Sequence, residues 1–171
     1  FIGRSFVSGD NVVTNEFLEK ESIGKKKIRE FWDWLLSNHD DPKTFIAFGF
    51  WINIEKNIFE PKWLAEHLRK TFEKSKGVID WDYGLTKSVV ELSKVAPKDM
   101  ASVARLHFLE GQVRNPDKQF PFIVESEWVE AFKILYKNPD TKKEIYNLVN
   151  DLISEGGSSF WSLKNVLDQE K

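Results

Sequence analysis

The chain lacks cysteine altogether, although it is 171 residues long. This absence excludes disulfide bonds, cysteine nucleophiles and zinc sites with cysteine ligands. No apolar run approaches the roughly 18 residues that a membrane-spanning helix needs, and the N-terminus lacks the basic, apolar and small-residue order of a signal peptide. We therefore expect a cytoplasmic protein with no membrane partner.

Neither sign of charge dominates the composition. The sequence has 25 Lys and Arg against 27 Asp and Glu, which gives a formal net charge of −2. No global field would therefore attract a polyanion, although a local basic face remains compatible with this balance. The hydrophobic content of 41% is enough to bury a core, so a folded domain is expected.

The motifs of common catalytic and cofactor sites are absent as well. The three histidines are not spaced as zinc ligands on a helix, and there is no glycine-rich phosphate loop or nucleophile elbow. Helix capping explains the acidic pairs Asp40-Asp41 and Asp80/Asp82 better than acid–base catalysis does. We predict a chain that is not an enzyme and has no metal or other cofactor.

Prolines at regular intervals mark the starts of amphipathic helical runs. Pro42, Pro61, Pro97 and Pro139 each lie just outside or just inside such a run. With a first unit opening near Lys25, the units repeat at about 36 to 42 residues, which is the length of a helix pair. The pattern predicts an all-α domain over residues 25–171, with about eight helices in antiparallel pairs near 25–56, 61–95, 97–137 and 139–170.

Two parts of this scheme allow another interpretation. Residues 1–24 begin with Phe and alternate apolar and polar residues, so we expect a partly extended lead-in that continues from an upstream region. A helical pattern runs from about Asn15 to Asn38, and Gly24 is expected to break it into two helices. Residues 44–54 are apolar nearly all round and rich in aromatic and β-branched side chains, so a strand is the alternative to a buried helix there.

Three turns between the predicted helices are alike. They read WLLSNHDDPKTF, VELSKVAPKDMA and KILYKNPDTKKE, and each joins an apolar helix end to a new helix through proline and acidic or hydroxyl residues. Helix pairs of this length with such turns resemble HEAT-like repeats. The resemblance implies an α-solenoid, a curved stack whose second helices, near 42–56, 84–95, 125–137 and 158–170, line a concave binding surface.

Polar stripes on two of these second helices are the first candidate contacts. Their side chains are spaced by three or four residues, which places them on one helix face. A solvated face with ion pairs inside each helix explains the same spacing. The stripes consist of Lys87, Glu91 and Lys94 on one helix and of Glu130, Lys133 and Lys137 on the other.

Two tryptophans supply the second set of candidates. Trp34 lies about 200° around the helix from Trp32, so both cannot face one core, and Trp34 marks either a contact between helix units or a partner site. The segment Asp80, Trp81, Asp82, Tyr83 is an acidic and aromatic loop that suits a basic ligand or peptide. Alternatively Trp81 packs between helices while Asp82 caps the next one.

The predicted function is that of a non-catalytic scaffold or recognition module that binds another protein or another domain of the same protein. Nucleic-acid binding is the alternative, with Lys25, Lys26, Lys27, Arg29, Lys62, Arg69, Lys70, Lys74 and Lys76 as candidate phosphate contacts. Nearby acids such as Glu30, Glu66 and Glu73 oppose it. A glycosylase-like enzyme with Trp81 and Asp82 in a cleft is a weaker third interpretation.

The C-terminal segment suggests one more alternative. Its sequence, KEIYNLVNDLISEGGSSFWSLKNVLD, resembles the terminal repeat of helical arrays that follow a nucleotidase or effector domain in large bacterial sensor proteins. This resemblance implies a sensing or autoinhibitory array within a multidomain defence-type protein.

Overall fold

The computed structural model describes residues 22–46, 59–78, 83–111 and 124–169, and within these ranges the chain forms helices and no strands. The prediction of an all-α fold is confirmed to that extent. The strand alternative for 44–54 is excluded only for its first residues, because 47–54 lie outside the described ranges. The helices are α3 (Ser22–Asn38), α4 (Lys43–Ile46), α5 (Pro61–Ser75), α6 (Tyr83–Val95), α7 (Pro97–Arg105), the π-helix η3 (Leu106–Glu110), α9 (Ser126–Lys137), α10 (Lys142–Ser154) and α11 (Phe160–Gln169).

Proline and aspartate set the helix starts largely as expected. Pro61 and Pro97 occupy the first turns of α5 and α7, where the missing N–H costs nothing because that group has no partner within the helix. An Asp41 carboxylate oxygen accepts a hydrogen bond from the backbone N–H of Lys43 at 3.1 Å before α4. The turn prediction at this point is confirmed.

One local expectation was wrong. Helix α3 continues through Gly24 without a break, since one glycine costs a helix only about 1 kcal/mol. Helix α9 begins at Ser126, and Glu125 precedes it without a side-chain cap. The Ser126 hydroxyl donates to the neighbouring Glu127 carboxylate at 2.7 Å, an acceptor strengthened by its charge.

The end of α5 is held tightly against the π-helix. Lys76 and Gly77 both have positive φ, and the Gly77 N–H donates to the Phe72 carbonyl at 2.8 Å, which closes the helix. A Cβ built on Gly77 would lie 2.2 Å from the carbonyl oxygen of Leu106 and 2.9 Å from the nitrogen of Gly111. The two glycines therefore allow the backbones of α5 and the α7–η3 helix to approach closely.

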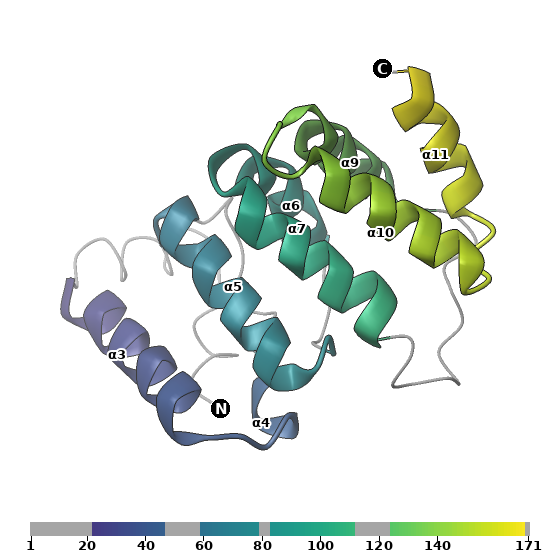
Figure 1. Cartoon of the computed structure of the whole chain (residues 1–171). Helices are drawn as coiled ribbons and strands as arrows, with labels where there is room; N and C mark the ends of the chain where they lie inside the picture. The colour runs from purple at the N-terminus through teal and green to yellow at the C-terminus, as the bar shows by residue number, and fades with distance from the viewer. Residues whose placement is uncertain (1–21, 47–58, 79–82, 112–123, 170–171) are drawn as a thin grey trace.

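The described helices form two layers (Figure 1). In one layer α3, α5, α7 and α10 lie side by side in chain order and run in the same direction, and each contacts the next. Behind them α6 packs against α9, which is the most extensive contact between two helices, and α11 packs on α9 and α10 at the far end. None of the described helices has the length and apolarity needed to cross a bilayer.

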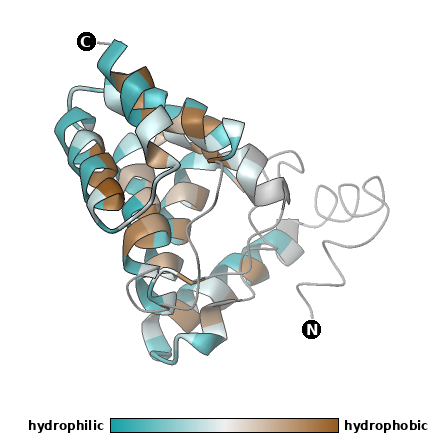
Figure 2. Ribbon diagram, turned by 90° about the vertical axis from the view of Figure 1, so that its right-hand side faces the viewer, coloured by the Kyte–Doolittle hydropathy of each residue, from teal (hydrophilic) through white to brown (hydrophobic). Residues whose placement is uncertain are grey.

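The apolar faces of these helices meet in one continuous core (Figure 2). Trp32, Phe72, Met100, Phe132 and Phe160 are fully buried in it. The π-helix supplies the centre, since the Phe108 ring lies 5.0, 5.9 and 5.5 Å from those of Trp128, Phe132 and Phe160. Trp32 and Trp128 are buried core residues, whereas Trp63 is partly buried and packs against the core.

Candidate interaction surfaces

The predicted acidic and aromatic loop is mostly outside the described part of the chain. Asp80, Trp81 and Asp82 lie in the gap before α6, and only the backbone of Tyr83 is described, at the first position of that helix. The loop therefore stays a prediction. Within the described ranges no cluster of histidine and acidic side chains is arranged to hold a metal ion.

The polar stripes lie on the two helices that pack most extensively against each other. Glu91 pairs with Lys94 on α6 at 2.5 Å, and Glu130 lies 3.9 Å from Lys133 on α9. Both pairs join residues three apart on one helix, as expected for a solvent-facing helix surface. Each such ion pair stabilises a helix by about 0.2–0.5 kcal/mol. Lys137 is exposed at the end of α9. The side chain of Lys87 lies outside the described residues, and partner contact by these stripes stays a prediction.

Trp34 lies in an exposed aromatic patch on α3. Trp34 and Phe31 are each 49% exposed, and their rings stack 6.2 Å apart. The His39 ring packs edge-on to Trp34 at 5.0 Å. Single exposed apolar residues are ordinary, but two large stacked rings on one helix face are a candidate for contact with another protein.

Helical geometry and one buried hydrogen bond orient this patch. Trp32 is fully buried against α5, where its indole N–H donates to the Thr71 hydroxyl at 2.9 Å. Since residues two apart point about 200° away from each other on a helix, the anchored Trp32 directs Trp34 outward. The sequence predicted this opposition, but it did not identify Phe31 as a second exposed ring beside Trp34.

Polar contacts beneath the patch attach α3 to α5. His67 is buried on α5, with Nδ1 2.9 Å from the Trp63 carbonyl oxygen and Nε2 2.6 Å from an Asp33 carboxylate oxygen. Lys74 donates to the Asp40 carboxylate at 2.5 Å, and this contact holds the pKa of Asp40 below its ordinary value of 3.8. An open groove of about 390 Å³ lies between the two helices, lined by Asp33, Leu36, Ser37, Lys70, Glu73 and Lys74.

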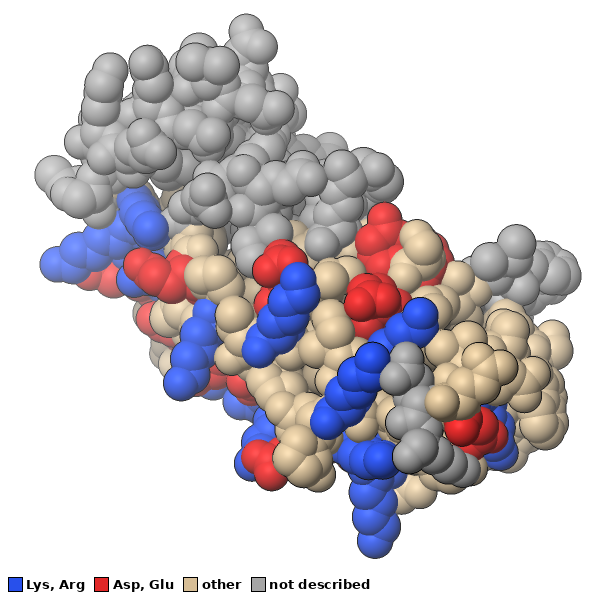
Figure 3. Space-filling view, turned by 90° about the horizontal axis from the view of Figure 1, so that it is seen from above, with Lys and Arg blue, Asp and Glu red and all other residues tan. Residues whose placement is uncertain are grey.

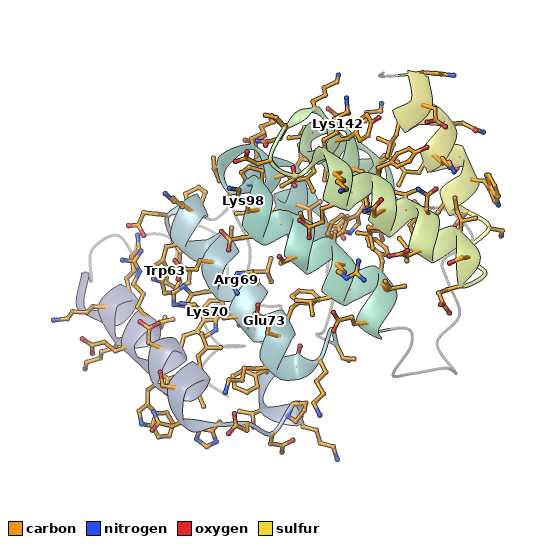
Figure 4. The ribbon with its side chains drawn as sticks, in the orientation of Figure 1. Trp63, Arg69, Lys70, Glu73, Lys98 and Lys142 are labelled. Carbon is orange, nitrogen blue, oxygen red and sulfur yellow. The ribbon has the colours of Figure 1, made fainter. Side chains whose placement is uncertain are left out.

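Most of the cations proposed for phosphate contact are paired with acids from the same or a neighbouring helix. Figure 3 shows both signs of charge side by side over one face of the molecule. Arg69 points toward α7 and donates to Asp99 at 2.8 Å, which raises the pKa of its guanidinium (Figure 4). The other pairs are Lys25 and Arg29 with Glu60, Lys26 with Glu30, Lys70 with Glu66, and Lys74 with Asp40. Lys27, Lys62 and Lys76 have no carboxylate partner among the described residues.

Sequence reasoning missed a second open groove at the other end of the molecule. This tyrosine groove, about 390 Å³ in volume, is lined by Tyr136, Pro139, Lys142, Lys143 and Tyr146. The two tyrosine rings lie 6.3 Å apart, and the Lys142 ammonium lies 4.9 Å from the Tyr136 ring centre. Tyr136 ends α9 and Tyr146 lies on α10, so a search of single helix faces did not bring them together. The available signal was the short Asn138-Pro139 turn, which folds one helix back on the other.

Comparison of the chain with models of protein families, with curated proteins and with solved structures gave no match. Function is therefore inferred from the described surfaces alone.

Proposed function

We propose that this chain is a non-catalytic interaction module, a stack of helix pairs that binds another protein or another domain of the same protein. The observation that carries the proposal is the exposed, stacked pair of Phe31 and Trp34 on α3. Large rings bury much area at little cost in side-chain entropy, and for this reason tryptophan is enriched among the residues that dominate binding energy.

The position of α3 supports this assignment. Among the described elements, α3 contacts α5 and lies at one end of the front layer, so its opposite face has no described helix against it. The buried Trp32 and the contact between Asp33 and His67 fix the helix on its inner side. The patch is thus presented by an anchored helix, which reduces the ordering cost of binding.

The order of helix contacts supports the solenoid interpretation. Helix α5 contacts α6, α7 contacts α9 and α10 contacts α11, as the predicted helix pairs require, and these pairs meet through α5 and α7, α7 and α10, and α6 and α9. A stack of this kind would offer extended surfaces rather than one enclosed cleft. Both described grooves are open, which agrees with a binding role.

The proposal is tested by affinity capture with paired serine variants. The intact chain is immobilised as wild type and as the double variant Phe31→Ser/Trp34→Ser, and the bound proteins are quantified by mass spectrometry. We expect the patch variant to lose its specific partner by about tenfold or more, because residues of this kind contribute about 2 kcal/mol or more each when they dominate an interface.

A matched control removes exposed apolar area elsewhere. Val95 and Trp161 are 47% and 54% exposed, so the double variant Val95→Ser/Trp161→Ser tests whether any exposed apolar residue supports capture. This control should retain the partner. Equal losses in both variants, or full retention by the patch variant at unchanged thermal stability, would contradict the proposal.

A further inference from the structure

The tyrosine groove combines Tyr146 and Pro139 with two lysines that have no acidic partner among the described residues, and the buried Tyr136 lies beneath them. Lys142 and Lys143 are exposed, and neither forms an ion pair with a described carboxylate. Both open α10, whose N-terminal end adds partial positive charge, and Glu144 in the same turn is partly buried and does not line the groove. We propose that this groove binds an acidic segment of a partner protein, with an apolar residue against Tyr146 and Pro139 and flanking carboxylates on the lysines.

Cation–π contacts place two ammonium groups beside the tyrosine rings. Lys142 Nζ lies 4.9 Å from the Tyr136 ring centre, and Lys164 Nζ lies 5.7 Å from that of Tyr146. Lys164 also donates to the Asn150 side-chain oxygen at 2.6 Å. Because an ammonium group has three donors, these contacts leave hydrogen-bonding capacity for a carboxylate. The ordered lysines therefore lose less freedom on binding than free ones.

The nearest acids have other partners or are turned away from the lining. Asp140 forms an ion pair with Lys98 at 3.0 Å, and Figure 4 shows Lys98 and Lys142 at the starts of α7 and α10. Asp151 lies 3.4 Å from Arg105 on α7. Glu144 is partly buried on α10 and does not line the groove. The lining residues thus include two positively charged lysines and no acid, which favours an anionic ligand.

The charge distribution favours a short acidic peptide over nucleic acid. A protein that binds a nucleic-acid backbone typically makes about 6–10 phosphate contacts along a track of cations. Among the described residues, the cations of α3 and α5 are largely paired with acids and do not extend the groove into such a track. Two lysines beside Tyr146 and Pro139 fit a ligand with a few carboxylates and one apolar side chain.

This inference deepens the proposed function by giving the chemistry of a partner, at a surface separate from Phe31 and Trp34. The probe is a fluorescein-labelled synthetic peptide in which glutamates flank a single leucine. Binding to the full chain is followed by fluorescence anisotropy at low and high salt. The comparison ligands are the same peptide with glutamine in place of glutamate, and a single-stranded oligothymidine.

We expect the glutamate peptide to bind, the glutamine peptide to bind at least about tenfold more weakly, and the variant Lys142→Gln/Lys143→Gln to lose about tenfold in affinity. The control Lys27→Gln/Lys62→Gln removes the same charge from exposed lysines with no aromatic groove and should bind as wild type. The variant Phe31→Ser/Trp34→Ser should also bind the peptide normally, which separates this inference from the proposed function.

Three outcomes would overturn the inference. One is equal binding of the glutamate and glutamine peptides. Another is an equal loss of affinity in the two lysine variants, which would indicate a non-specific charge effect. The third is tighter binding of the oligothymidine with a steep salt dependence that Lys142→Gln/Lys143→Gln reduces, which would assign the groove to nucleic acid.

Discussion

At the scale of single residues, the contrast between Trp32 and Trp34 determines which part of α3 is available to a partner. Trp32 is fully buried and donates to Thr71, which in turn donates to the His67 carbonyl at 2.7 Å. Burying a polar group without a hydrogen-bond partner lowers stability, so the Thr71 hydroxyl contributes to stability by accepting the Trp32 N–H. It links a buried indole to the backbone of the neighbouring helix.

We predict that Thr71→Val lowers the free energy of unfolding by about 1–3 kcal/mol, because it keeps the side-chain shape but removes the acceptor of the Trp32 indole N–H. Urea unfolding of Thr71→Val, of Trp32→Phe and of the double variant provides the measurement. The double variant should lose less stability than the two single losses added together. Strict additivity would show that the hydrogen bond contributes nothing.

At the scale of helices, the junction between α5 and the π-helix depends on glycine. Gly77 has a φ of 83°, and its missing side chain leaves room for the Leu106 carbonyl. Gly156, after α10, has a similar φ of 98° but nothing lies within 4 Å of the Cβ built there. The two positions therefore separate the cost of backbone conformation from the cost of a steric clash.

Gly77→Ala should destabilise the protein by about 2 kcal/mol more than Gly156→Ala does. Both substitutions force alanine into the left-handed region at about 1–2 kcal/mol, and only the first adds a clash with another helix. Thermal or urea unfolding of the two variants gives the comparison. Similar losses would mean that α5 and the α7–η3 helix separate readily and that the close approach is unimportant.

At the scale of the whole molecule, the described helices differ in how many neighbours they pack against, and the proposed stack of helix pairs makes a prediction from that difference. The central helices α6, α7 and α9 have described neighbours on both sides, whereas α3 and α11 lie at the ends. In stacked repeats the stability of a unit depends on its own helices and its interfaces with adjacent units. End units have one interface fewer and open more easily.

We therefore predict a gradient of amide hydrogen exchange along the stack. Protection should be greatest in α6, α7 and α9 and should fall toward α3 and α11, because opening an end helix breaks fewer contacts. Native-state exchange followed by mass spectrometry provides the measurement. Uniform protection across all helices would instead indicate one closed unit that opens as a whole, and the solenoid interpretation would then be wrong.

The sequence predicted the features that depend on contacts within one helix, and it missed those that depend on contacts between helices. Prolines and apolar periodicity located α5, α7 and α10 because these signals act within one helix. The π-helix at Leu106–Glu110 was not predicted, because Phe108 within it packs among rings from α9 and α11 that are distant in the sequence. The tyrosine groove was missed for the same cause, because Tyr136 and Tyr146 meet only after the turn at Pro139 is folded.

The neighbour-to-neighbour order of helix contacts also has a consequence for synthesis on the ribosome. Several described helices have their principal partner beside them in the chain, as α4 with α5 and α10 with α11, so these contacts form with little loop closure. Helix α6 is different, because its most extensive contact is with α9, and residues 96–125 must be made before that partner begins. A nascent chain paused in this interval would expose the apolar surface of α6 that α9 later covers, which is the kind of surface that chaperones bind.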